Sequence, residues 1–290
     1  MILITGAAGP TGLAAIRQLA ARNADVRILT RSEESAERCK AAGAGEAVLG
    51  DFRSDADLKT ALAGADRVYH IGPRFQGDEY EIGVRIIDAA KKEGVSQFAF
   101  HSLVHPMCRK LLHHWEKLRV EEYLIESLVP YTILAPTMYM QNINVEWPSI
   151  LKTGVYRRFY SVDIDMSVVD LDDVGEAAAI MLTEDGWTGG SFEMCSPYPL
   201  THAEMAKIFS EVSGRDIRAE KGDIADWIAA AKKRGQDDYS IEGFVKMCEH
   251  YDDYGLPGGN GRVLGMILGR APTDYRTFAE KWWAAHPPES

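Results

Sequence analysis

Three kinds of feature are scarce in this chain of 290 residues, and each narrows its function. The cysteines are few, far apart and without a CxxC pair, so neither a metal site nor a disulfide framework is expected; they are Cys39, Cys108, Cys195 and Cys248. No apolar run approaches the roughly 18 residues of a membrane span, so we expect no membrane association. Lys and Arg number 32 against 43 Asp and Glu, and a net charge of −11 argues against direct nucleic-acid binding.

The remaining composition is that of a globular protein with a sizeable core. Hydrophobic residues make up 46% of the chain and charged residues 26%. The first apolar run begins at Ile2, which leaves no room for a signal peptide, so a cytoplasmic location is expected. We expect a monomer or a homodimer.

The amino terminus carries the strongest motif. The apolar run Ile2–Thr5 leads into a turn with Gly6, Gly9 and Gly12, and residues 13–20 follow as a predicted helix. Strand, glycine turn and helix bring the diphosphate of a dinucleotide against a helix N-terminus. The residues expected at the cofactor are Gly6, Ala8, Gly9, Pro10, Thr11 and Gly12. The GxxGxxG spacing resembles the extended and atypical branches of the short-chain dehydrogenase/reductase superfamily.

Strand and helix alternate through the first half of the chain. Further strands are predicted at residues 26–30, 46–49, 67–71, 98–101 and 131–135. Helices are predicted at residues 34–42, 56–62, 80–93 and 110–127. This alternation predicts an α/β fold of Rossmann type, with a doubly wound parallel sheet and right-handed crossovers.

The pattern changes after Pro136. Residues 138–160 are aromatic and irregular, residues 172–183 and most of 223–254 are predicted as helices, and 191–195 as a strand. A capping box at Thr201 predicts another helix start. We expect a Rossmann domain over residues 1–152, with a returning segment near 166–195, and a smaller α+β substrate lobe over 153–290. In open α/β sheets the ligand lies at the carboxyl ends of the strands.

Arg31 directly follows the second predicted strand, where NAD-binding folds usually place a carboxylate. A guanidinium there can grip the 2′-phosphate of NADP, so NADP(H) is the expected cofactor. The alternative is a solvated surface arginine. Glu33 and Glu34 lie close by and keep NAD(H) possible, since either could reach a 2′-hydroxyl.

Two dipeptides follow the next strands. Asp51 and Phe52 come after the third strand, where the superfamily resemblance implies contact with adenine; Asp51 could equally cap a helix. Gly72 and Pro73 end the fourth strand and are expected beside the adenosine ribose, although the glycine could serve only the turn.

The tyrosine of standard superfamily catalysis, four residues before a lysine, is missing. Its lysine corresponds to Lys117, and His113 stands in the tyrosine's place, on the same helix face. Lys117, if partly buried, could act as a base, and His113 could donate a proton near neutral pH. Ser102, after the fifth strand, completes the catalytic candidates. Each also has a plain interpretation: a solvated lysine, a polar helix residue, and a serine bonded to backbone.

The segment after this helix narrows the resemblance. Glu121-x-x-Leu124-x-x-Ser127 is followed by Pro130-Tyr-Thr-Ile-Leu134 and by Pro136-x₅-Asn142, and the chain resembles the NmrA-like family of atypical short-chain reductases. Leu268–Thr273 with Phe278 extends the similarity. The resemblance implies that Pro136, Tyr139 and Asn142 border the nicotinamide. Tyr139 could supply a hydroxyl or only pack.

Two functions follow from these features. The first is an NADP(H)-dependent oxidoreductase that transfers hydride to a small aromatic or conjugated acceptor such as a quinone, enone or ketone. The aromatic segment after Pro136 favours a flat apolar substrate. The alternative is a non-catalytic redox sensor that binds NAD(P) and regulates a protein partner, which requires different affinities for the oxidised and reduced cofactor.

Overall fold

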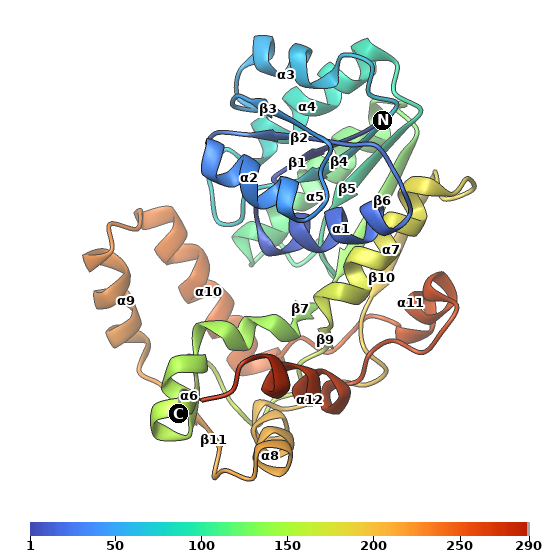
Figure 1. Cartoon of the computed structure of the whole chain (residues 1–290). Helices are drawn as coiled ribbons and strands as arrows, with labels where there is room; N and C mark the ends of the chain where they lie inside the picture. Colours follow the sequence, from blue (N-terminus) through green and yellow to red (C-terminus); the bar gives the residue numbers. More distant parts are fainter. Residues whose placement is uncertain (289–290) are drawn as a thin grey trace.

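The computed structural model describes residues 1–288, and a seven-stranded parallel sheet forms its centre (Figure 1). The strands lie in the order β10-β6-β5-β4-β1-β2-β3. They are β1 (Ile2–Thr5), β2 (Val26–Thr30), β3 (Glu46–Leu49), β4 (Arg67–Ile71), β5 (Gln97–His101), β6 (Tyr131–Pro136) and β10 (Gly190–Met194). The predicted α/β fold of Rossmann type is confirmed.

The inner strands read as continuous apolar runs because helices cover both faces of the sheet. β1, β2 and β5 are buried along their whole length, whereas the edge strand β3 is partly exposed. One face carries α1 (Pro10–Ala21), α2 (Glu33–Ala41), α7 (Leu171–Thr183) and α11 (Gly261–Leu268). The other carries α3 (Asp55–Leu62), α4 (Glu79–Glu93) and α5 (Leu112–Glu126). The bounds of the predicted helices differ from these by at most three residues, and α11 was not predicted.

Helix α7 returns to the sheet layer late in the chain and lies beside α1 (Figure 1). Gly175 permits the close approach, since a Cβ there would lie 2.8 Å from the carbonyl carbon of Ala14. The strand that follows α7, β10, pairs in parallel with β6. The returning segment therefore supplies both a covering helix and an edge strand.

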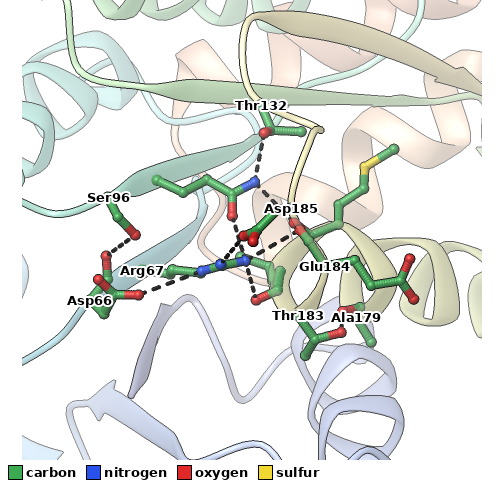
Figure 2. A network of polar contacts seen from close by, with 11 residues as sticks. Asp66, Arg67, Ser96, Thr132, Ala179, Thr183, Glu184 and Asp185 are labelled. Carbon is green, nitrogen blue, oxygen red and sulfur yellow. Dashed lines mark hydrogen bonds and ion pairs between the residues drawn. The ribbon is translucent and has the colours of Figure 1, made fainter.

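A polar network fastens the end of α7 to the amino-terminal ends of the strands (Figure 2). Arg67, the first residue of β4, donates to the carbonyl oxygen of Leu182 at 3.0 Å and to Asp185 at 2.9 Å. Gln97, the first residue of β5, donates to Thr132 at 2.7 Å and to the carbonyl oxygen of Met181 at 3.0 Å. The partly buried Arg67 and the buried Gln97 hold the returning segment at the amino-terminal ends of the strands.

Each face of the sheet has its own apolar core beneath its helices. The remaining elements, in the lower part of Figure 1, surround a third apolar core. They are β7 (Met138–Tyr139), η1 (Met140–Val145), α6 (Trp147–Thr153), β8 (Val155–Arg158), β9 (Val168–Val169), α8 (His202–Ser213), β11 (Arg218–Lys221), α9 (Ile224–Lys233), α10 (Asp238–Tyr254) and α12 (Tyr275–Ala285). Thr201 caps α8 with the predicted capping box. The division of the chain at residue 152 stays a prediction.

Residues 1–288 contain neither a helix that could span a membrane nor a cluster of potential metal ligands. None of their helices combines the length and apolar character of a membrane span. Nor does any group of three or more His, Cys, Asp or Glu side chains in this part of the chain have the arrangement of a metal site.

Candidate active site

A cleft of about 1310 Å³ opens at the carboxyl ends of the strands and extends along the third core. Most residues predicted at the cofactor or in catalysis line it. They are Gly6, Gly9, Pro10, Thr11, Arg31, Phe52, Gly72, Pro73, Ser102, His113, Lys117, Pro136, Tyr139 and Asn142. Three predicted residues are not in the lining: Ala8, Gly12 and Asp51. The fold thus brings together side chains from six strand ends and from α5.

The glycine turn has no room for side chains at two positions. Gly6 has a φ of +68°, and a Cβ there would lie 2.2 Å from the carbonyl oxygen of Ile71. A Cβ on Gly12 would lie 2.2 Å from the carbonyl oxygen of Ala7, so this buried glycine sets the packing of α1 against the turn rather than facing the cleft. Both positions therefore require glycine.

The turn fits the diphosphate of a dinucleotide. Helix α1 begins after Gly9 with Pro10 at its start, and no side chain caps it. The first-turn amides of the helix, with its positive dipole end, are therefore free to bind an anion. Arg31 is exposed at the end of β2 and lines the same cleft, where the 2′-phosphate of NADP would need a cation.

Asp51 does not face the cleft. Its carboxylate accepts from the amide of Arg53 at 2.9 Å, and the same arginine binds Asp78. The cap of α3 is Ser54, so Asp51 does not perform the alternative capping role either. Phe52 does line the cleft, and its contact with adenine stays a prediction.

The Tyr139 hydroxyl is part of a chain of hydrogen bonds that begins at the glycine turn. Thr11 donates to the Tyr139 hydroxyl oxygen at 3.4 Å, and that oxygen lies 2.5 Å from Nε2 of His101. The Nδ1 atom of His101 lies 2.6 Å from the hydroxyl of Tyr69, which is fully buried. In either tautomer of the ring, one nitrogen donates and the other accepts. Tyr139 therefore places a hydroxyl in the cleft, and the buried imidazole of His101 lies within hydrogen-bond distance of it.

Burial sets the protonation states of the groups in this series of hydrogen bonds. It lowers the pKa of His101 to about 3, helped by the positive charge of Lys117 and by His70, so the ring is neutral at pH 7. Burial also raises the pKa of Tyr139, which keeps its hydroxyl protonated. The hydroxyl thus keeps its proton at pH 7, and an N–H donated from Nε2 of His101 would stabilise the oxygen when that proton is transferred.

Lys117 is neither a solvated lysine nor an unpaired one. Its side chain is 8% exposed, and Nζ donates to Glu79 at 2.8 Å and to the main-chain oxygen of His101 at 3.0 Å. Glu79 is 1% exposed; burial raises its pKa and the ammonium of Lys117 opposes that rise. The contacts with Glu79 and with the main chain of His101 give Lys117 a positioning role, and its predicted action as a base stays a prediction.

His113 is buried against Phe75 and His114, with ring centroids 4.6 and 4.5 Å away. Burial holds its pKa well below the usual range, with smaller effects from His114, Arg74 and Lys117. The lowered pKa disfavours the imidazolium form near neutral pH. Whether His113 takes the place of the missing tyrosine stays a prediction.

Ser102 lies in the cleft wall and donates its hydroxyl to Glu121 in a short hydrogen bond. Burial raises the pKa of Glu121, and the Ser102 hydroxyl and Lys117 oppose that rise. A serine whose proton is engaged with a buried carboxylate fixes α5 against β5. Its predicted catalytic role stays a prediction.

Two residues of this cluster were not predicted, His101 and Glu79. His101 closes the apolar strand β5, and a polar residue at the carboxyl end of a buried strand was the available signal. Glu79 begins α4 and carried no signal, since an acid in a first helical turn is ordinary. A Cβ on Gly72 would lie 2.9 Å from Oε1 of Glu79, so that glycine makes room for this carboxylate.

A Rossmann sheet with a glycine turn and a helix lysine at its strand ends defines a dinucleotide-binding protein of the short-chain reductase type. The chain belongs to the NmrA-like family, whose profile matches residues 1–273.

Individual relatives agree with this assignment. The chain is 33% identical, over 231 residues, to the (4-alkanoyl-5-oxo-2,5-dihydrofuran-3-yl)methyl phosphate reductase of Streptomyces griseus, covering 76% of this chain and 77% of the relative. It is 28% identical to quinone oxidoreductase 2 of Escherichia coli over 284 residues, 97% of this chain and 96% of the relative. The structure of an Escherichia coli NADPH-dependent quinone oxidoreductase complexed with NADPH superposes with a TM-score of 0.83 at 25% identity, covering 98% of this chain and 100% of that one.

Proposed function

We propose that this protein is an NADP(H)-dependent reductase that delivers hydride to a small aromatic or conjugated acceptor. The single observation that carries the proposal is the Tyr139 hydroxyl, which lies in the cleft between the glycine turn and the buried His101. Relatives named as a quinone oxidoreductase and as a reductase of a conjugated furanone support it. A cytoplasmic monomer or homodimer stays part of the proposal.

Bound NADPH supplies the hydride, and the chain supplies the proton. Reduction of a quinone or ketone adds one hydride to the acceptor and one proton to the oxygen that becomes negative. Tyr139 gives that proton by breaking its O–H bond. The phenolate left behind accepts hydrogen bonds from Thr11 and from the Nε2–H tautomer of His101, and water in the cleft returns the proton after product leaves.

Lys117 contributes by holding this pair in place. Its ammonium binds the main-chain oxygen of His101 and is itself anchored by Glu79. The imidazole is thereby fixed at its backbone as well as at both ring nitrogens. We assign Lys117 as a positioning residue, with contact to the cofactor ribose kept as the prediction from the family resemblance.

The test is NADPH oxidation with a panel of quinones, enones and azo compounds, combined with titration of NAD, NADH, NADP and NADPH by calorimetry. Turnover with at least one acceptor, and tighter binding of NADPH than of NADH, are expected. Preference for an oxidised cofactor with no turnover would instead support the redox sensor. If none of the four cofactors gives a binding heat, both the reductase and the redox sensor are rejected.

The cofactor preference is tested at Arg31. We expect Arg31→Ala to weaken NADPH binding by roughly tenfold or more, the scale of a hydrogen-bonded charge pair, and to leave NADH binding nearly unchanged. Arg38→Ala, on the exposed face of α2, is the matched control. Equal losses for both cofactors would show that Arg31 does not bind the 2′-phosphate.

A further inference from the structure

The far part of the cleft contains an arginine without an acidic partner. Arg158, the last residue of β8, lines the cleft. One guanidinium nitrogen donates to the hydroxyl of Tyr156 at 2.7 Å, and the group lies 4.6 Å from the centre of that ring. Its Nε atom is buried and has no hydrogen-bond partner. Within residues 1–288, Arg158 forms no ion pair with a carboxylate.

The surroundings leave this charge uncompensated. Tyr156, Tyr160 and His202 pack in the third core beside Arg158, and both ring nitrogens of His202 lack partners. Burial and the charge of Arg158 hold the pKa of His202 well below its usual range, so that ring is neutral. A partly buried cation in such surroundings is destabilising unless a partner offsets its lost hydration.

The nearby charged residues do not supply that partner. Lys221, beside Arg158 across the strand pair, is occupied by Asp252 at 2.7 Å. Glu146 lines the same cleft without forming an ion pair with Arg158; burial raises its pKa, and Arg158 and Arg157 oppose that rise. Glu220, Asp223 and Asp226 also line this part of the cleft, and none of them forms an ion pair with Arg158: Glu220 bonds Arg218, and Asp223 caps α9.

This arginine belongs to the same cleft as the proposed proton donor. Tyr160 donates to the sulfur of Met138 at 3.6 Å, and Met138 directly precedes Tyr139. Aromatic side chains cover another part of the cleft, where Trp227 and Phe244 stack with ring centroids 3.8 Å apart and Phe159 lies against both. The cleft thus combines an apolar aromatic wall, a hydroxyl donor and a partly buried cation.

We infer that Arg158 binds an anionic group on the acceptor, a carboxylate, sulfonate or phosphate attached to a flat conjugated body. Of the two terminal nitrogens of this guanidinium, one bonds Tyr156 and the other makes no hydrogen bond within residues 1–288, so it can donate to an oxygen of such a group. The anion offsets the partly buried charge, and the aromatic wall binds the conjugated part. The inference rests on the proposed function for the reaction, but the binding site can be tested without turnover.

The kinetic test compares two acceptors that differ in charge, 2-methyl-1,4-naphthoquinone and 1,4-naphthoquinone-2-sulfonate. We expect Arg158→Gln to lower kcat/KM for the sulfonate about tenfold to hundredfold more than for the uncharged quinone, mainly through KM. Taking the ratio within each variant removes the difference in reduction potential between the acceptors. Arg158→Lys, which keeps the charge but not the planar fork, should recover part of the preference.

The matched control is Arg218→Gln. Arg218 lies on β11, the strand paired with β8, where it bonds Glu220, and it does not line the cleft. Its substitution by Gln changes the net charge by the same amount as Arg158→Gln. It should leave the ratio between the two acceptors unchanged. An equal shift in the ratio for Arg218→Gln and Arg158→Gln would assign the effect to overall charge and overturn the inference, as would no shift in either.

A binding experiment separates this inference from the reductase proposal. In calorimetry with NADP present, naphthalene-2-sulfonate should bind more tightly than its uncharged sulfonamide, and Arg158→Gln should abolish the difference. If that holds while neither quinone is reduced, the anion site stands and the reductase proposal fails. If quinones are reduced but the sulfonate binds wild type and Arg158→Gln alike, the anion site fails and the reductase stands. Circular dichroism shows whether each variant is folded. If Arg158→Gln does not fold, the same comparison is made with Arg158→Lys.

Discussion

Tyr139 and His101 are the residues on which the proposed proton transfer depends. Tyr139→Phe removes the hydroxyl and keeps the ring, so we expect kcat to fall roughly hundredfold or more while NADPH affinity stays within about twofold. Steady-state kinetics and calorimetry measure the two quantities. Tyr123→Phe, which removes a hydroxyl bonded to Asp88 outside the cleft, should leave both unchanged. An undiminished kcat in Tyr139→Phe would reject Tyr139 as the proton donor.

The Lys117–Glu79 pair makes a different prediction, because it concerns stability. Lys117→Met leaves the Glu79 carboxylate buried without a partner, so we expect the free energy of unfolding to fall by about 3–5 kcal/mol. The double variant Lys117→Met/Glu79→Gln should recover most of that loss. Urea unfolding measures both.

This pair also bears on how activity data are interpreted. A loss of turnover in Lys117→Ala alone would not distinguish a catalytic lysine from a broken ion pair. If the double variant is as unstable as the single one, the ion pair is not the reason that Lys117 is needed.

The sequence predicted some of these residues and not others. Lys117 and Tyr139 were found because a family pattern places them at fixed points relative to a helix and a strand. His101 and Glu79 were not, because they come from β5 and α4 and acquire a role only when the sheet brings them to Lys117. The neutrality of His113 was likewise out of reach, since it follows from burial against Phe75 rather than from the helix face.

At the scale of elements, α7 and β10 were predicted within one residue at each end, since their apolar patterns and flanking residues are local. What they pack against depends on residues at the other end of the strands. Arg67 and Gln97 occur at ordinary strand starts, and only the assembled sheet shows that they hold the end of α7 (Figure 2).

Because of this network, we expect the variant Arg67→Met to be less stable but to bind NADPH as the wild type does. Arg67→Met loses the bonds to Leu182 and Asp185, and we expect the free energy of unfolding to fall by about 2 kcal/mol because a buried carbonyl loses its donor. NADPH affinity should be unchanged, since the network lies at the opposite ends of the strands. Asp185→Asn is the control: its carboxylate is 97% exposed, so the loss should stay below about 0.5 kcal/mol. Equal losses in the two variants would mean that only the surface ion pair matters.

At the scale of the whole molecule, buried histidines should make the protein sensitive to acid. Burial lowers the pKa of His70 and His101 to about 3 and that of His114 to about 4. Unfolding returns these groups to about 6.5, so the unfolded chain binds more protons as the pH falls below that value. Each such group costs about 2 kcal/mol of stability between pH 6.5 and 5. Carboxyls whose pKa burial raises, such as Glu79 and Asp170, act in the opposite direction.

Urea unfolding at pH 7.5 and 5.0 measures this effect. We expect stability to fall steeply towards pH 5, and His114→Gln, which removes a titrating ring, to reduce the slope. A stability that is constant, or that rises on acidification, would show that the carboxyls outweigh the histidines.

The pairing of β10 with β6 also governs when the sheet can be completed during synthesis. A nascent chain that has emerged only to residue 152 presents β6 as an open edge, with unpaired main-chain groups and without the cover of α7. Closure waits until Met194 leaves the ribosome, and residues 153–189 must all emerge first. Chaperone dependence should therefore be greatest for translation intermediates that end between these two points.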